Sequence, residues 1–170
     1  RHPLLITTKS DRIVRDLDLL EQMAALNLVY VAISVTSLDA ELARKLEPRA
    51  PHPAKRLQAI GALAAAGVPV QVNVSPIIPC LTDQDLEAIL AQAAKTGARR
   101  ASYILLRLPH EVAPLFREWL QAHFPDRAEK VMNIHRAMRG GRDNDPEFGG
   151  RMRGQGIWAA LFSQPGRISP

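Results

Sequence analysis

Cysteine is nearly absent from this sequence, which has one among 170 residues and so cannot form a disulfide within the chain. It also lacks any apolar run near the roughly 18 residues that a membrane-spanning helix requires. The lack of a disulfide favours a reducing compartment. Together the two absences predict a cytoplasmic protein that does not cross a membrane.

Several motifs of common enzyme families are also missing. No glycine-rich turn follows the first two strand-like runs, which argues against a Rossmann dinucleotide site, and Lys9-Ser10 lacks the preceding glycines of a phosphate-binding loop. No Gly-x-Ser-x-Gly elbow indicates a hydrolase. His123 and His135 lie on different predicted helices without further ligands at metal spacing, which argues against zinc. His110-Glu111 offers acid-base chemistry, but a surface turn is the favoured interpretation.

Four apolar runs, each ending in a polar group and followed by a helical pattern, organise the rest of the chain. They are Leu4 to Thr8, Val29 to Val35, Val68 to Ser75 and Ala101 to Leu108. This alternation predicts an α/β fold with parallel strands, either an open doubly wound sheet or an arc of a (β/α) barrel. The first strand is expected to be buried, and the second to be covered on both faces.

The intervening segments have helical periodicity and recognisable helix ends. Ser10 is a candidate N-cap, Thr82 and Asp85 resemble a capping box, and Gly67 and Gly97 are placed to end helices. After the fourth strand the pattern predicts two helices, Pro114 to Phe124 and Asp126 to Arg139, then a glycine- and arginine-rich tail in which Trp158 to Phe162 docks again. We therefore predict β/α units over residues 1–109 and, on the same domain, a helical extension over residues 110–170.

The net charge of +5 is unevenly distributed along the sequence. Residues 1–98 carry ten basic and ten acidic side chains, whereas residues 99–170 carry twelve and seven. One interpretation is that the segment from Arg136 to Arg153 binds phosphate or nucleic acid; the other, which is favoured, is a solvated basic surface.

Polar side chains gather where the predicted strands end. If the strands are parallel, one edge of the sheet carries Lys9, Ser34, Asn73, Ser75 and Arg107. Two cations and several neutral hydrogen-bonding groups suit a ligand with a carboxylate or phosphate. The simpler alternatives are that Asn73 and Ser75 satisfy turn backbone and that Lys9 reaches only solvent. Arg107 interrupts an apolar run, where an unpaired cation would be costly.

Short motifs, in order, resemble the later half of bacterial radical S-adenosylmethionine proteins related to spore photoproduct lyase. They are Ile6-Thr7-Thr8-Lys9-Ser10, Ile33-Ser34-Val35-Thr36, Leu46-Glu47-Pro48-Arg49-Ala50-Pro51, Arg56-Leu57 and Ile78-Pro79. A further set resembles one largely uncharacterised branch of that group: Leu106-Arg107-Leu108-Pro109, Leu115-Phe116-x-x-Trp119-Leu120 and Arg151-Met152-Arg153-Gly154.

The resemblance implies a partial (β/α) barrel that binds S-adenosylmethionine and a 4Fe-4S cluster at its strand ends. In such enzymes the cluster reduces S-adenosylmethionine to a 5′-deoxyadenosyl radical, which abstracts hydrogen from a substrate. Lys9 and Ser34 match positions that hold the carboxylate or ribose of the cofactor. Glu47, Arg49 and Arg107 are assigned to the rim of the site on its substrate side, or to ion pairs that fix a loop. Asn73 and Ser75 are assigned to the substrate side.

The chain departs from this family in its cysteines. Members hold the cluster with a Cys-x-x-x-Cys-x-x-Cys motif, whereas this sequence has only Cys80, which we interpret as a loop or packing thiol. We therefore expect the C-terminal portion of a longer enzyme, inactive by itself, with neither cofactor bound and no catalytic or metal-ligating residue. Such a portion leaves Leu4 to Thr8 as an open edge, which predicts self-association there or cover by the C-terminal segment.

Overall fold

The computed structural model describes residues 2–143 together with residues 156 and 160. These residues form two compact units, each described by itself below. Unit 1 contains residues 2–75 and 85–103, and unit 2 contains residues 76–84 and 104–143 with 156 and 160. No helix in the described ranges is both long and apolar enough to span a bilayer.

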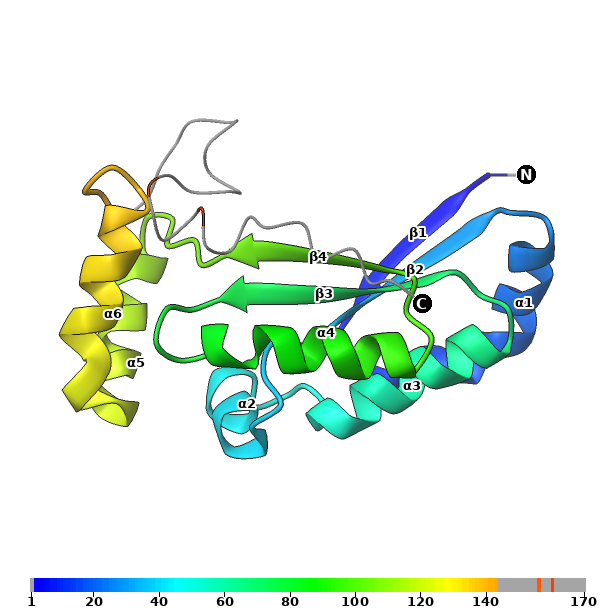
Figure 1. The fold of residues 1–170 in the computed structure, drawn as a ribbon, viewed down its shortest axis with the longest axis horizontal. Helices are drawn as coiled ribbons and strands as arrows, with labels where there is room; N and C mark the ends of the chain where they lie inside the picture. The colour runs from blue at the N-terminus through cyan, green and yellow to red at the C-terminus, as the bar shows by residue number, and fades with distance from the viewer. Residues whose placement is uncertain (1, 144–155, 157–159, 161–170) are drawn as a thin grey trace. The chain divides into compact units, whose positions relative to one another are not determined.

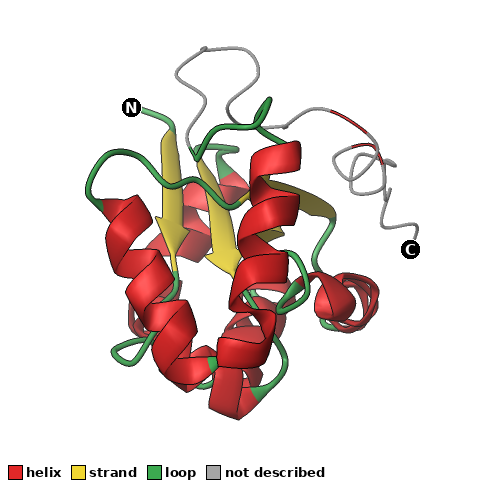
Figure 2. Cartoon of the chain, turned by 90° about the vertical axis from the view of Figure 1, so that its left-hand side faces the viewer, coloured by secondary structure: helices red, strands yellow, loops and turns green. Residues whose placement is uncertain are grey.

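Four strands form one sheet in the order of the sequence. Figure 1 labels the four strands, and Figure 2 shows strands and helices by colour. The strands are β1 (Leu4–Thr8), β2 (Val29–Ser34), β3 (Val70–Ile77) and β4 (Arg100–Leu105). The pairs β1/β2 and β2/β3 are parallel, and β3 and β4 point the same way in Figure 1. The predicted α/β class with parallel strands is confirmed, and the arrangement is that of a partial (β/α) barrel.

Helices follow each of the first three strands. In unit 1 they are the 3-10 helix η1 (Asp11–Asp16) and the helices α1 (Leu17–Ala25), α2 (Ala40–Leu46), α3 (Pro53–Ala65) and α4 (Leu86–Lys95), which lie on one side of the sheet (Figure 1); the short 3-10 helix η2 (Asp83–Asp85) precedes α4. Ser10 caps η1 as predicted, since its hydroxyl accepts from the Arg12 amide at 3.2 Å. Gly67 and Gly97 follow α3 and α4 with positive φ, and a Cβ on Gly97 would lie 2.6 Å from the Ala64 Cβ.

The two faces of the sheet in unit 1 differ in chemistry. Along β3, Val70, Val72 and Val74 are buried, whereas the alternate residues Gln71 and Asn73 are partly exposed. The apolar face packs with helix residues that are fully buried, such as Ile60, Leu63 and Ile89. This packing orients the opposite face, which carries the polar side chains, away from the helices.

Unit 2 contains two helices that pack on each other, α5 (Val112–His123) and α6 (Pro125–Ala137), close to the predicted bounds. Leu120, Val131 and Met138 have no exposed surface. The docking predicted for Trp158 to Phe162 lies outside the described residues.

Three local predictions are wrong. β1 is not buried, because it is an edge strand with a neighbour on one side only among the described residues, and Leu4 and Leu5 are 43% and 67% exposed. β4 ends at Leu105 and not at Leu108. Thr82 and Asp85 form no capping box.

The capping box does not form because the Thr82 and Asp85 side chains accept hydrogen bonds from other parts of the chain. The Thr82 hydroxyl accepts from the Ile78 amide at 2.8 Å within unit 2. The Asp85 carboxylate accepts from the Leu38 amide at 3.0 Å and from the Ser37 hydroxyl within unit 1. A partner in the preceding turn takes the Thr82 hydroxyl and long-range partners take the Asp85 carboxylate, in place of the cap that the spacing suggested.

Candidate cofactor-binding site

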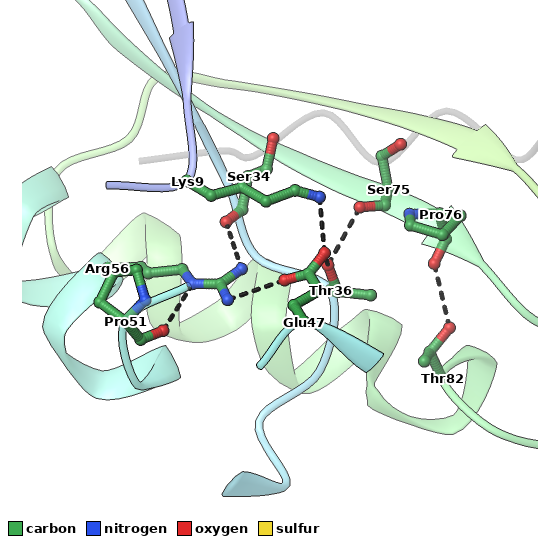
Figure 3. A network of polar contacts seen from close by, with 9 residues as sticks. All are labelled: Lys9, Ser34, Thr36, Glu47, Pro51, Arg56, Ser75, Pro76 and Thr82. Carbon is green, nitrogen blue, oxygen red and sulfur yellow. Dashed lines mark hydrogen bonds and ion pairs between the residues drawn. The ribbon is translucent and has the colours of Figure 1, made fainter. Parts of the chain in front are cut away.

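Glu47 joins two cations in the loop that follows α2. Its Oε1 lies 2.5 Å from the Nζ of Lys9, the first residue after β1, and its Oε2 lies 2.7 Å from the Nη2 of Arg56 on α3. The Lys9 side chain is 40% exposed, that of Glu47 is 13% exposed and that of Arg56 is 1% exposed. One buried cation and one accessible cation therefore share a carboxylate (Figure 3).

Backbone carbonyl groups hold Arg56 in place. Its Nε donates to the Pro51 carbonyl at 2.9 Å, and its Nη1 donates to the Ser34 carbonyl at 3.1 Å (Figure 3). A buried guanidinium is costly unless hydrogen bonds and an opposite charge compensate it; here two carbonyl groups accept hydrogen bonds and Glu47 supplies the charge. The arginine thus ties the proline-rich loop to the end of β2.

The Thr36 hydroxyl links the same carboxylate to β3. Its Oγ1 lies 2.9 Å from the Oε1 of Glu47 and 3.0 Å from the Ser75 carbonyl oxygen, so its one proton is offered to two acceptors. We call Lys9, Thr36, Glu47 and Arg56 the Glu47 cluster. It connects the carboxyl ends of three neighbouring parallel strands.

The cluster is ionised at neutral pH. Burial raises the pKa of Glu47, but the ion pairs and hydrogen bonds with Lys9 and Arg56 outweigh burial and hold that pKa below its usual range. With Glu47 negative and both partners positive, the cluster carries a net charge of one positive unit. The excess lies toward the solvent, because Arg56 is buried and Lys9 is not.

The hydroxyls of Ser34, which is 6% exposed, and of Ser75, which is partly exposed, lie on the side of these serines opposite the cluster. The backbone carbonyls of Ser34 and Ser75 face Arg56 and Thr36, whereas their side-chain hydroxyls point away from the cluster (Figure 3). Ser34 is paired in register with Asn73, so both lie on the polar face of the sheet. Of the predicted residues in unit 1, Lys9 and Ser34 lie at the ends of β1 and β2, whereas Asn73 and Ser75 lie within β3.

Asn73 belongs to a hydrogen-bonded row on that face and not to a turn. Its Oδ1 accepts from the Gln71 amide at 2.7 Å and from the Ser102 hydroxyl at 2.5 Å. The Tyr30 hydroxyl donates to the Gln71 Oε1 at 3.2 Å, and the guanidinium of Arg100 lies 5.9 Å from the Tyr30 ring centroid. No sequence motif indicated Tyr30, Arg100 or Ser102, whereas strict alternation of polar and apolar residues along β3 would have indicated Gln71.

The remaining predicted residues lie elsewhere. Arg49 is exposed in the loop between α2 and α3. Arg107 belongs to unit 2, two residues beyond the end of β4. A place for either residue in the site stays a prediction.

The residues present do not fit an iron-sulfur cluster. The sequence has one cysteine, Cys80, which lies in unit 2 with a φ of 63°, and its carbonyl accepts from Arg127. Over residues 2–143, 156 and 160, no three histidines, cysteines or carboxylates are grouped as metal ligands would be. A cluster with one open iron requires three protein ligands, which these residues do not supply.

The strand ends do fit the amino-acid end of S-adenosylmethionine. A partly exposed ammonium, in a cluster with one excess positive charge, matches a carboxylate. The Ser34 hydroxyl, on the polar face, suits a neutral group such as a ribose hydroxyl.

The basic segment proposed for nucleic acid lies mostly outside the described residues. Within unit 2, Arg136 pairs with Asp143 at 2.8 Å, and the buried Arg139 donates to the Leu106 carbonyl at 2.9 Å. His135 is fully buried, and burial lowers its pKa despite the Asp143 carbonyl 2.8 Å from its Nε2. These side chains serve internal contacts, and nothing in the comparisons below supports nucleic-acid binding.

Comparisons with known proteins identify the family. Residues 1–93, which include the whole Glu47 cluster, match the radical SAM superfamily. An uncharacterized protein of Mycobacterium tuberculosis is 35% identical over 136 residues, which is 79% of this chain and 40% of that protein. An uncharacterized protein of Methanocaldococcus jannaschii is 28% identical over 134 residues, which is 78% of this chain and 48% of that protein. The chain thus spans less than half of the length of these relatives. Because the match covers more than half of its residues, the chain belongs to the radical SAM superfamily.

Proposed function

We propose that this chain supplies the cofactor-holding strand ends of a radical SAM enzyme, with Lys9 and Ser34 binding S-adenosylmethionine. Lys9 and Ser34 would hold S-adenosylmethionine, which in a complete radical SAM enzyme would supply a 5′-deoxyadenosyl group for hydrogen abstraction from a substrate. The observation that carries the proposal is the accessible Lys9 ammonium of the Glu47 cluster, within the segment that matches the superfamily.

Lys9 is assigned to the carboxylate of the cofactor. An ammonium has three donors, and Glu47 takes one of them at 2.5 Å. The side chain is 40% exposed, which leaves its remaining donors within reach of a ligand. A charge-assisted hydrogen bond to a carboxylate is about twice as strong as a neutral one, so this contact orients the amino-acid end of the cofactor.

The polar face of the sheet is assigned to the ribose and to the substrate. Ser34 lies at the end of β2, and Asn73 and Ser75 follow on β3. Arg49, exposed in the loop between α2 and α3, is assigned to the substrate side, and a substrate role for Arg107 of unit 2 stays a prediction. These groups bind and orient neutral or anionic parts of a ligand, and none of them is assigned a proton transfer.

The proposal also covers the branch of the superfamily and the location of the cysteines that bind the cluster. The motifs that resemble proteins related to spore photoproduct lyase favour that branch of the superfamily. The relatives are more than twice as long as the part that matches, so we place the cluster-binding cysteines in a portion of the enzyme outside these 170 residues. The coding sequence upstream tests this placement, because absence of a three-cysteine motif there contradicts the mechanism.

Binding measurements on the reconstituted holoenzyme test the assignment of Lys9. We expect Lys9→Met to raise the Kd for S-adenosylmethionine by about tenfold or more, since a hydrogen bond to a charged group is lost. Lys55→Met, which removes an exposed lysine from α3, is the matched control and leaves the Kd unchanged. Equal Kd values for the Lys9→Met variant and the unmodified enzyme would overturn the proposal.

A further inference from the structure

We propose that Glu47 is a positioning residue: anchored by Arg56, it holds the Lys9 ammonium where the cofactor carboxylate binds. The inference rests on the proposed function, in which Lys9 contacts that carboxylate. It goes further by naming the residue that gives Lys9 its place and by predicting which chemical group of the ligand will respond when that residue is changed.

Glu47 bridges the buried side chain of Arg56 and the partly exposed side chain of Lys9. Arg56 is 1% exposed, and two carbonyl groups and one carboxylate oxygen hold its guanidinium. Lys9 has a four-carbon stem and is 40% exposed, so its ammonium would sample many positions without a partner. The carboxylate transmits the fixed position of Arg56 to the lysine through its two oxygens.

Glu47 itself has little freedom. Its side chain is 13% exposed, Arg56 lies 2.7 Å from one oxygen, and the Thr36 hydroxyl lies 2.9 Å from the other. A group restrained in this way orders its partner before a ligand arrives, which reduces the entropy lost on binding.

The charges of the cluster give the same conclusion. Glu47 neutralises one of two cations, and the cation that is left is the accessible Lys9. The cluster is therefore one negative charge short of neutrality at its solvent side. A ligand carboxylate supplies that charge, whereas a neutral group of the same shape does not.

A purely structural role for Glu47 predicts a different outcome. If the carboxylate only fastens the loop between α2 and α3, changing it weakens all ligands to the same degree. If it positions Lys9, the loss falls on ligands that carry the carboxylate. The ratio of two dissociation constants separates these roles.

The probes are S-adenosylhomocysteine and its carboxamide, in which an amide replaces the carboxylate. Binding of both to the holoenzyme is measured by calorimetry, and the discrimination is the Kd of the carboxamide divided by the Kd of the acid. Glu47→Asp keeps the charge of the cluster and shortens the side chain by one methylene, which moves the carboxylate away from Lys9 or Arg56. We expect this variant to lower the discrimination about tenfold.

The control is a glutamate-to-aspartate substitution at an exposed ion pair. Glu41→Asp shortens the partner of Lys45 in an exposed pair on α2, with Glu41 66% exposed, and leaves the discrimination unchanged. Thr36→Val is a milder second variant that removes one restraint on Glu47 and retains its charge. It is expected to lower the discrimination about threefold, and it carries the test should Glu47→Asp fail to fold.

The outcomes separate this inference from the function on which it rests. If Lys9→Met leaves the discrimination intact, the proposed function fails. If Lys9→Met abolishes the discrimination but Glu47→Asp and Thr36→Val leave it at the level of the unmodified enzyme, Lys9 binds the carboxylate unaided and the inference is overturned. A fall in all three variants, with Glu41→Asp unchanged, supports both.

Discussion

Each unit of this protein contains one carboxylate between two cations, and the two clusters differ mainly in burial. In unit 1, Glu47 lies between Lys9 and Arg56. In unit 2, Asp143 lies between Arg117 and Arg136. The formal charges are identical, yet Arg56 is 1% exposed whereas Arg117 and Arg136 are 43% and 38% exposed.

The comparison shows that the exposure of its side chains, and not the number of its ion pairs, determines how much such a cluster contributes to stability. Water and salt screen the Asp143 pairs, and exposed pairs of this kind contribute about 0–1 kcal/mol each. The buried side of the Glu47 cluster has no such screening, so removal of one partner leaves a charge that nothing replaces. A buried anchor with one accessible cation is suited to holding a ligand.

The largest effect is expected from Arg56→Met. This change leaves Lys9 as the one cation paired with Glu47 among the described residues, and it removes the donors to the Pro51 and Ser34 carbonyl groups. We expect the free energy of unfolding in urea to fall by about 3 kcal/mol. The double variant Glu47→Gln with Arg56→Met should lose less, because no buried charge remains. A loss below about 1 kcal/mol for the single change would show that the cluster is not effectively buried.

Acid titration provides a second contrast. The pKa values of Glu47 and Asp143 both lie below the usual range, because their cation partners outweigh burial. Each carboxylate therefore contributes stability that is complete above its unfolded pKa and is lost as the pH falls through its lower folded pKa.

Salt distinguishes the two titrations. At about 1 M salt the screening length is about 3 Å, so the pKa of Asp143 should rise toward its usual range while that of Glu47 changes less. Carbon-detected NMR of the side-chain carboxyl groups measures both. Equal responses of the two groups to salt would contradict the contrast.

The smallest effect is expected from Asp143→Asn. Both partners are exposed, and the contact with His135 uses the backbone carbonyl, which the change retains. We expect the free energy of unfolding to change by less than about 1 kcal/mol. A loss above about 2 kcal/mol in the same urea titration would show that the Asp143 cluster contributes as a buried cluster does, and would contradict the comparison.

Much of the fold was predictable because it depends on local pattern. The bounds of β1 match the apolar run, and the helices begin close to Ser10, Asp39 and Pro53, where capping residues and proline favour a start. The exposure of β1 was not predictable, since it depends on which strands are neighbours. The Thr82–Asp85 box failed because Asp85 bonds to residues 47 and 48 positions earlier.

The site was predictable in its location but not in its connections. Lys9 and Ser34 follow from the rule that parallel strands place polar groups at their carboxyl ends. The pairing of Glu47 with Arg56 crosses a loop with two prolines and the start of α3, and no spacing rule relates these two positions. Tyr30 and Ser102 were missed because their role depends on the register of three strands.

The most direct test of the account observes Lys9 itself while a ligand binds. The chain has five lysines, and reductive methylation with carbon-13 gives each an NMR signal while retaining its charge. On titration with S-adenosylhomocysteine, we expect the Lys9 signal, assigned through Lys9→Arg, to shift and broaden, and titration with the carboxamide to leave it in place. Equal shifts with both ligands, or a response confined to the other lysines, would contradict the claim that the Glu47 cluster presents Lys9 to a carboxylate.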